Sequence, residues 1–210
     1  MKNKDPIPDC KVTLVGDSGV GKSSIIGRYI SGIFKDDSMS TSGANYSQKV
    51  YERKNQKVRL NIWDTAGQEK YRSLGRNFYK DSYIICLIFD ITDKQSFKNV
   101  KEIWYPEIKK YGEKYNILSI VGNKSDLFED EEVQDEEINS FVEEIGGQYF
   151  LVSAKNGNGI EPMFKTLANL YLNPNFKDKV EQDRSFRSNS IKLTKESIKK
   201  KNSHKKGCCN

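Results

Sequence analysis

A glycine-rich stretch near the N-terminus has the sequence GDSGVGKSS, residues 16–24, and fits the pattern G-x-x-x-x-G-K-[ST]. A short apolar run precedes it, and a helical pattern through about Ser31 follows it. Such a loop turns backbone N–H groups toward one point, and the N-terminus of the following helix adds a dipole that favours anions. The stretch therefore predicts a phosphate-binding loop, with a chance match in an ordinary glycine-rich turn as the alternative.

The residues of this loop divide by role. The ammonium group of Lys22 is expected to reach the β- and γ-phosphates of a nucleotide, and the hydroxyl of Ser23 is expected to bind Mg²⁺. Glycines at positions 16 and 21 allow the backbone to wrap closely around the phosphates. The remaining expected phosphate contacts are Asp17, Ser18, Gly19, Val20, Gly21 and Ser24.

A second motif is WDTAGQE, residues 63–69. Asp64 ends a predicted strand and is expected to hold the Mg²⁺ shell, while the backbone N–H of Gly67 can contact a γ-phosphate. Gln68 can orient a water molecule for in-line attack. The pattern D-x-x-G is weak alone, but Asp64 follows Gly21 by 43 residues and a predicted hairpin, which strengthens the interpretation.

Two further motifs predict recognition of a guanine base. In NKSD, residues 123–126, the carboxylate of Asp126 can accept bonds from the guanine N1–H and 2-amino groups, which adenine lacks there. Asn123 can assist from the other ring edge, and the alkyl stem of Lys124 can cover the base. The later motif SAK can offer backbone donors to the guanine oxygen from Ser153, Ala154 and Lys155.

The elements alternate between strand and helix patterns. Six strands and five helices predict an α/β fold with a doubly wound, mostly parallel sheet, one antiparallel strand and helices on both faces. Every motif then falls at the carboxyl end of a strand, where such sheets bind ligands. Pro106 lies inside one predicted helix and is expected to kink or shorten it. The predicted strands are 10–15, 45–52, 57–63, 83–90, 117–123 and 148–153. A helical stretch runs through about residue 31, and the later predicted helices are 97–111, 134–145 and 160–172.

The positive charge of the chain is concentrated in its C-terminal tail. The whole chain of 210 residues has a net charge of +6, whereas residues 174–210 contain 11 Lys/Arg and 4 Asp/Glu. The body of the protein is therefore nearly neutral, which argues against nucleic acid as a partner. We expect a short extension over residues 1–9, one domain over 10–173 and a flexible basic tail over 174–210.

The apolar runs, the N-terminus and the cysteines indicate where in the cell the chain is expected to lie. The longest apolar run covers residues 83–89, far short of the ~20 residues of a membrane span. The N-terminus has no apolar signal region, and Lys2 excludes N-myristoylation, so the chain is expected to be neither secreted nor membrane-spanning. Cys10 and Cys86 lie in apolar runs typical of buried cysteine, and no disulfide or zinc spacing is present.

Together these motifs resemble the Rab family of the Ras superfamily of small GTPases. The resemblance covers about residues 10–172, including RLNIWDTAGQEKYRSL at 59–74 and LIFDIT at 87–92. It implies a P-loop GTPase fold, with GTP and GDP as substrate and product and Mg²⁺ as cofactor. It also implies Phe34 as an aromatic edge against the base and Thr41 as second Mg²⁺ ligand and γ-phosphate sensor. The aromatic residues that the family presents to effectors would be Tyr46, Trp63 and Phe78, although core packing explains the last two equally well.

The resemblance also extends to the last three residues, CCN, because Rab proteins are commonly prenylated on paired terminal cysteines. Lipidation of Cys208 and Cys209 would anchor the chain to the cytoplasmic face of an intracellular membrane, helped by the basic tail. The alternatives are a solubilising tail with two idle thiols and a nuclear-localisation signal. Family partners implied are an exchange factor, a GTPase-activating protein, a GDP dissociation inhibitor and an escort protein with its prenyltransferase.

Some positions depart from the family pattern. Ser42 and the pair Asn45-Tyr46 differ from the usual first switch, so the effector cannot be carried over. Asp81-Ser82 replaces a usual Gly-Ala. The leading expectation is a prenylated trafficking switch with slow intrinsic hydrolysis. A nucleotide-holding module that does not cycle is the first alternative, and an ATP-dependent P-loop kinase or motor, against which Asp126 argues, is the second.

Overall fold

The computed structural model describes residues 6–34, 45–65, 78–113, 116–176 and 178. The chain divides into two compact units, residues 1–172 and 173–210. The fold described below belongs to the first unit. Within the described ranges, no helix is both long and apolar enough to cross a membrane.

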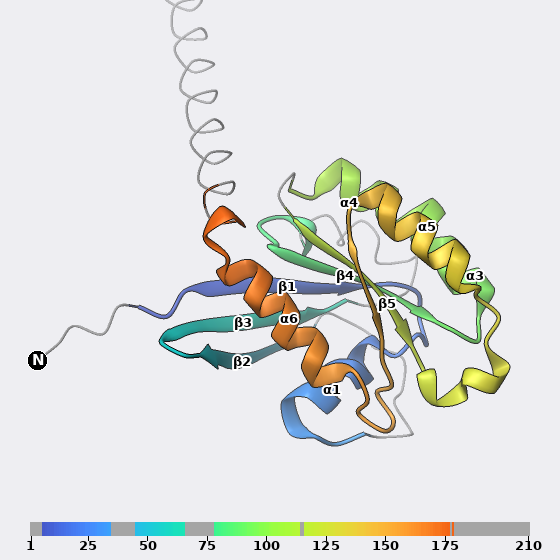
Figure 1. Cartoon of the computed structure of the whole chain (residues 1–210), viewed down its shortest axis with the longest axis horizontal. Helices are drawn as coiled ribbons and strands as arrows, with labels where there is room; N and C mark the ends of the chain where they lie inside the picture. Colours follow the sequence, from blue (N-terminus) through green and yellow to red (C-terminus); the bar gives the residue numbers. More distant parts are fainter. Residues whose placement is uncertain (1–5, 35–44, 66–77, 114–115, 177, 179–210) are drawn as a thin grey trace, which may run out of the picture. The chain divides into compact units, whose positions relative to one another are not determined.

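One six-stranded sheet forms the centre of this unit (Figure 1). Its strand order is β2-β3-β1-β4-β5-β6, with β2 antiparallel to β3 and every other neighbouring pair parallel. The prediction of a mostly parallel sheet with one antiparallel strand is therefore confirmed. The strands are β1 (Asp9–Val15), β2 (Asn45–Arg53), β3 (Gln56–Asp64), β4 (Ile84–Asp90), β5 (Ile117–Asn123) and β6 (Gln148–Leu151).

Helices cover both faces of the sheet (Figure 1). Helices α1 and α6 lie on one face, and α3, α4 and α5 lie on the other. This arrangement explains why every residue of β4 is buried, since a central parallel strand has apolar cover on both sides. The helices are α1 (Lys22–Ser31), α3 (Lys94–Asn99), the π-helix η2 (Val100–Trp104), α4 (Tyr105–Tyr111), the 3₁₀-helix η3 (Ser125–Asp130), α5 (Asp135–Ile145) and α6 (Ile160–Leu172).

The alternating side chains of β4 divide the core between the two faces. Ile85, Leu87 and Phe89 belong to the cluster packed under α3, η2, α4 and α5. On the opposite face, the ring of Tyr29 in α1 stacks on Phe164 in α6, with 3.8 Å between ring centroids. The two helix layers therefore hold a single sheet between two apolar clusters.

The segment around Pro106 forms a π-turn where the sequence predicted a kinked or shortened helix. The helix begins at Lys94, earlier than expected, because the side chain of Asp93 caps it and accepts from the N–H groups of Gln95 and Ser96. The N–H of Tyr105 donates to the carbonyl of Val100, which is a π-helical bond. A proline has no N–H for the carbonyl four residues earlier and crowds it, so the wider turn just before Pro106 relieves that conflict.

The unusual pair Asp81-Ser82 has a specific accommodation in the fold. Asp81 adopts a left-handed backbone with φ of 59°, a conformation that glycine adopts freely and aspartate tolerates. The fully buried hydroxyl of Ser82 lies 2.8 Å from the hydroxyl of Thr13 on β1 and donates to the carbonyl of Phe78. Because the buried hydroxyls of Ser82 and Thr13 both have hydrogen-bond partners, the polar residue at position 82 costs the fold little stability.

Candidate nucleotide-binding site

The glycine-rich loop between β1 and α1 depends on two close backbone approaches. A Cβ atom on Gly16 would lie 2.2 Å from the carbonyl oxygen of Ile88, and one on Gly21 would lie 2.3 Å from Nδ2 of Asn123. Gly21 is also the N-cap of α1, with a left-handed φ of 92° and no side-chain cap. The first N–H groups of α1 therefore face the loop without an internal partner, as an anion-binding helix end requires.

Lys22 places its ammonium group at the centre of this loop. The side chain is buried, and Nζ donates to the carbonyl oxygens of Gly16 at 2.8 Å and Asp17 at 2.6 Å. Burial lowers the pKa of Lys22 to about 8, against the opposing influence of the carboxylates of Asp64 and Asp17. The two acceptors of this ammonium are neutral carbonyl groups, and a polyphosphate bound in the loop would replace them with negatively charged oxygens.

Asp64 and Ser23 together form a site suited to a divalent cation. The hydroxyl of Ser23 donates to Oδ2 of Asp64 at 2.5 Å, while the buried Oδ1 has no hydrogen-bond partner among the described residues. Burial raises the pKa of Asp64, although the Ser23 bond and the charge of Lys22 oppose this rise. Hydroxyl and carboxylate oxygens are the ligand types that Mg²⁺ prefers, and the orphaned oxygen fits a metal ion or its water.

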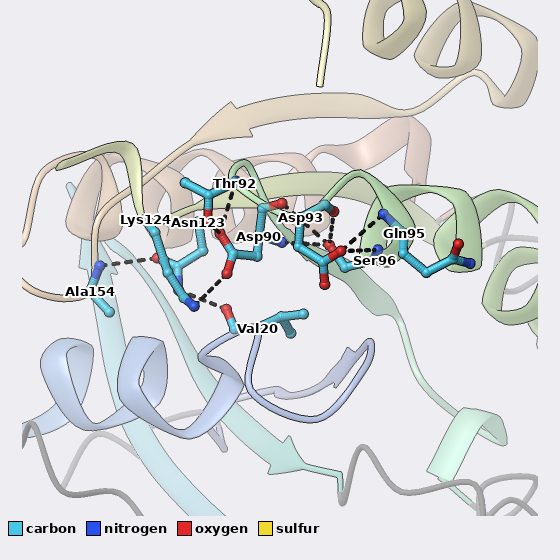
Figure 2. Close-up of polar contacts among 9 residues, drawn as sticks. All are labelled: Val20, Asp90, Thr92, Asp93, Gln95, Ser96, Asn123, Lys124 and Ala154. Carbon is cyan, nitrogen blue, oxygen red and sulfur yellow. Dashed lines mark hydrogen bonds and ion pairs between the residues drawn. The ribbon is translucent and has the colours of Figure 1, made fainter. Parts of the chain in front are cut away.

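Asn123 connects the phosphate loop with the two predicted base-recognition motifs (Figure 2). Its side chain is only 2% exposed. Its Nδ2 donates to the carbonyl of Val20 at 2.8 Å, and its Oδ1 accepts from the N–H of Ala154 at 3.1 Å. A single carboxamide therefore holds three loops in a fixed arrangement.

Lys124 and Asp126 follow at the end of β5. Lys124 adopts a left-handed backbone with φ of 67°, and its Nζ forms an ion pair with Oδ2 of Asp90 (Figure 2). The carboxylate of Asp126 accepts from the hydroxyl of Ser153. The motifs at 123–126 and 153–155 are thus brought together, although about 30 residues separate them in the sequence.

Ser96 supports this arrangement from behind. Its hydroxyl accepts from the N–H of Asp90 at 3.0 Å and donates to the carbonyl of Asp93 at 2.7 Å, and the residue is 1% exposed. Asp90 in turn accepts from Thr92 (Figure 2). No sequence motif predicts a role for Asp90 or Ser96, although the stretch LIFDIT contains Asp90.

Arg28 on α1 is another residue that sequence reasoning missed. Its guanidinium donates to three carbonyl oxygens, those of Ala154 at 2.8 Å, Gly32 at 2.6 Å and Lys155. Its Cζ also lies 6.0 Å from the ring centroid of Phe34, the predicted aromatic edge of the base site. An arginine six residues after Lys22 has no local signal for its bonds to Ala154 and Lys155, because these partners lie more than a hundred residues away in sequence.

The three predicted effector residues lie together at one end of β2 and β3. The ring of Trp63 lies 5.1 Å from that of Tyr46 and 5.9 Å from that of Phe78, measured between centroids. Tyr46 is 48% exposed, and the other two rings are half-buried. The group is therefore a surface cluster and not part of the buried core.

Several predicted residues cannot be placed. Thr41, Gly67 and Gln68 lie outside the described residues, as do Cys208 and Cys209. Ser18 and Ser24 lie in the loop and in the first turn of α1, at the positions that the motif predicts.

This geometry is that of a P-loop fold. The sequence pattern of the Ras family matches residues 11–173. GTP-binding protein YPTM2 of Zea mays is 37% identical over 158 residues, which are 75% of this chain and 77% of that protein. Ras-related protein RABD2a of Arabidopsis thaliana is 36% identical over the same shares. Ras-related protein Rab-11B of Dictyostelium discoideum is 36% identical over 170 residues, 81% of this chain and 77% of that protein.

The chain therefore belongs to the Ras family, and within it is a Rab-like small GTPase of the trafficking type. GTP hydrolysis to GDP and phosphate is the reaction of this family and of this chain. The prediction of the family and of its reaction is confirmed.

Nucleotide affinity should depend on pH through Lys22. Bound phosphates raise the pKa of this ammonium above its unliganded value of about 8. The contribution of Lys22 to nucleotide affinity is therefore complete below about pH 8 and is lost as the pH rises through the higher pKa of the bound form. We expect the dissociation constant for GDP, measured by calorimetry, to increase between about pH 7 and about pH 9.5. In Lys22→Arg, whose guanidinium stays charged, the pH dependence should flatten even though affinity is lower. Equal slopes in both proteins would contradict this account.

Replacing Arg28 by lysine should destabilise the domain. A lysine ammonium cannot reproduce the fixed planar geometry of these three bonds, so at least one is lost, at a cost of about 0.5–1.5 kcal/mol for each lost bond in the free energy of unfolding. Urea denaturation of GDP-bound protein measures this. The matched control is Arg59→Lys, because Arg59 forms an exposed pair with Asp9 at 3.2 Å, and its loss should cost about 0–1 kcal/mol. An equal loss in the two variants would refute the role of Arg28.

Proposed function

We propose that this chain is a membrane-anchored guanine-nucleotide switch in vesicle trafficking, with the site residues in the roles described below. The observation that carries the proposal is the convergence of the phosphate loop, the orphaned carboxylate oxygen of Asp64 and the Asn123–Asp126 motif at the carboxyl ends of neighbouring parallel strands. Each group has chemistry suited to one part of GTP, and Asn123 holds the parts together.

The base is bound by three groups of residues. The carboxylate of Asp126 accepts from the guanine N1–H and 2-amino groups, and Ser153 already holds that carboxylate in place. Lys124 covers one face of the ring with its alkyl stem, and Phe34 lies at its edge. With ATP, Asp126 would face an acceptor where guanine offers donors, so the adenine nucleotide binds poorly.

The phosphates are bound by the loop backbone from Asp17 to Ser24 and by Lys22. Mg²⁺ would be held by Ser23 and Asp64 together with Thr41, and when bound it supplies positive charge beside the β- and γ-phosphate oxygens. The ammonium of Lys22 then exchanges its two carbonyl acceptors for phosphate oxygens, an exchange that favours the charged form.

Hydrolysis proceeds by attack of a water molecule on the γ-phosphorus. Gln68 orients that water, and the N–H of Gly67 holds the γ-phosphate until the bond to the β-phosphate breaks. Loss of this contact releases the switch segments, about residues 36–46 and 66–80, and the effector cluster of Tyr46, Trp63 and Phe78 changes with them. Intrinsic turnover is slow, since a GTPase-activating protein normally supplies an arginine.

The tail is the proposed membrane anchor. We assign residues 10–173 to the GTPase domain, preceded by the short extension 1–9, and 174–210 to a basic tail that ends in prenylated Cys208 and Cys209. Lysines of the tail add attraction to anionic cytoplasmic leaflets. An exchange factor, a GDP dissociation inhibitor and an escort protein with its prenyltransferase complete the proposed cycle.

Nucleotide competition followed by single-turnover hydrolysis tests the switch. The purified protein with Mg²⁺ should prefer GTP to ATP by at least about a hundredfold, because the half-buried carboxylate of Asp126 would meet an acceptor of adenine in place of the two donors of guanine. Asp126→Asn should lose that preference, and Gln68→Leu should bind GTP normally but hydrolyse it at least about tenfold more slowly. A protein that binds GTP without hydrolysing it would be a nucleotide-stabilised scaffold instead.

Truncation tests the anchor. A chain that ends before Cys208 should bind GTP as the full chain does and should no longer sediment with membranes after expression in eukaryotic cells, because it lacks both prenylation sites. The matched control replaces Cys10 by serine and keeps the tail intact, which should leave sedimentation unchanged. Membrane sedimentation of the truncated chain would exclude the terminal cysteines as the anchor.

A further inference from the structure

Asp17 lies in the phosphate loop, but its carboxylate is bonded to two donors outside that loop, on α3 and η2. Nδ2 of Asn99 donates to Oδ2 at 2.6 Å, and the indole Nε1–H of Trp104 donates to Oδ1 at 2.7 Å. Both carboxylate oxygens are therefore bonded by neutral donors. Hydrogen bonds to an ionised acceptor are short and strong compared with those between neutral groups.

The two donors reach one carboxylate because of the π-turn. In a regular α-helix, residues five apart lie about 140° apart around the axis, so Asn99 and Trp104 would point to different sides. A π-turn has an i→i+5 backbone hydrogen bond, so it brings residues five apart toward the same side of the helix. Here η2 covers Val100–Trp104, and the N–H of Tyr105 bonds to the carbonyl of Val100 within it. The π-turn thus lets Asn99 and Trp104 donate together to the two carboxylate oxygens of Asp17.

The backbone of Asp17 contacts the side chain of Lys22. Its carbonyl oxygen accepts from Nζ of Lys22 at 2.6 Å, while its carboxylate is bonded on the side of η2. Trp104 is only 5% exposed and is packed in the core cluster beneath α3 and α5, so its indole is a fixed point. The peptide at Asp17, which shapes the phosphate cradle, is therefore tied to the rigid helix layer.

We infer that Asp17, Asn99 and Trp104 form a positioning clamp that holds the phosphate loop in its nucleotide-binding shape and so slows nucleotide release. The inference rests on the proposed nucleotide site. It assigns no contact with the nucleotide to the carboxylate of Asp17, whose role is to fix the backbone that bears the phosphate-binding N–H groups. Loops that bind without rearrangement retain ligands longer, because no ordering cost is incurred on binding.

The test compares release rates of a fluorescent GDP analogue from the full chain with Mg²⁺, chased by excess unlabelled GDP. Asp17→Asn and Trp104→Phe should each release it about tenfold faster than the unmodified chain, because each removes a bond to the carboxylate. In the double variant the increase in release rate should be smaller than the product of the two single increases, since both changes act on the same side-chain cluster. The matched acid-to-amide control is Glu102→Gln on η2, which pairs at 4.0 Å with Lys98 and should release at the original rate.

A second measurement separates positioning from packing. Urea unfolding, monitored by circular dichroism, gives the free energy of unfolding of each GDP-bound variant. Lower stability with unchanged release rates would overturn the clamp and leave Trp104 as a packing residue only. If Trp104→Phe fails to fold, Asn99→Ala removes the other donor and should also speed release. Failure of the unmodified chain to bind the GDP analogue would instead refute the proposed nucleotide site.

Discussion

The site depends on the carboxamide of Asn123. It is almost fully buried, and its two ends bond to the backbone of the phosphate loop at Val20 and of the SAK loop at Ala154. Neither end can be lost without leaving a buried polar group unpaired, at a cost of about 1–3 kcal/mol. Gly21 is required at the point of contact because any Cβ there would meet the same carboxamide. The proposed base-binding and phosphate-binding motifs therefore share one anchor.

Around this anchor, the charged groups of the site are supported by the helix layers. Lys124 pairs with Asp90, whose backbone N–H is held by Ser96 at the start of α3. Arg28 joins α1 to the SAK loop, and Asp17 joins the phosphate loop to η2. Each loop thus has a partner in the rigid part of the fold. Preorganised donors and charges of this kind need no rearrangement when a ligand with complementary charge arrives.

The fold and the four motifs were predictable because their signals are local. The continuous apolar run of β4 marks a strand buried on both faces, and each motif follows a strand whose position the sequence already indicates. The cap at Asp93 was also a local signal, and it would have placed the helix start correctly.

The supporting residues could not be predicted in the same way. Arg28 and Trp104 act through side-chain bonds to groups that the fold brings near, and bond partners 126 or 87 residues away leave no pattern in the sequence. The π-turn could not be located from Pro106 alone, because a proline can be accommodated by a kink, a break or a wider turn. Trp104 before the proline and Ile108 after it both pack in the core cluster, and the π-turn allows both contacts.

The π-turn has a consequence for how many residues this helix holds. A wider turn contains one residue more than an α-helical turn, so it absorbs an additional residue locally and leaves the flanking segments in register. Phe97 before it and Ile108 after it both face the same core cluster. The extra residue of η2 is therefore already accommodated: this helix holds one residue more than a regular helix of the same span, and both flanking side chains still reach the interior.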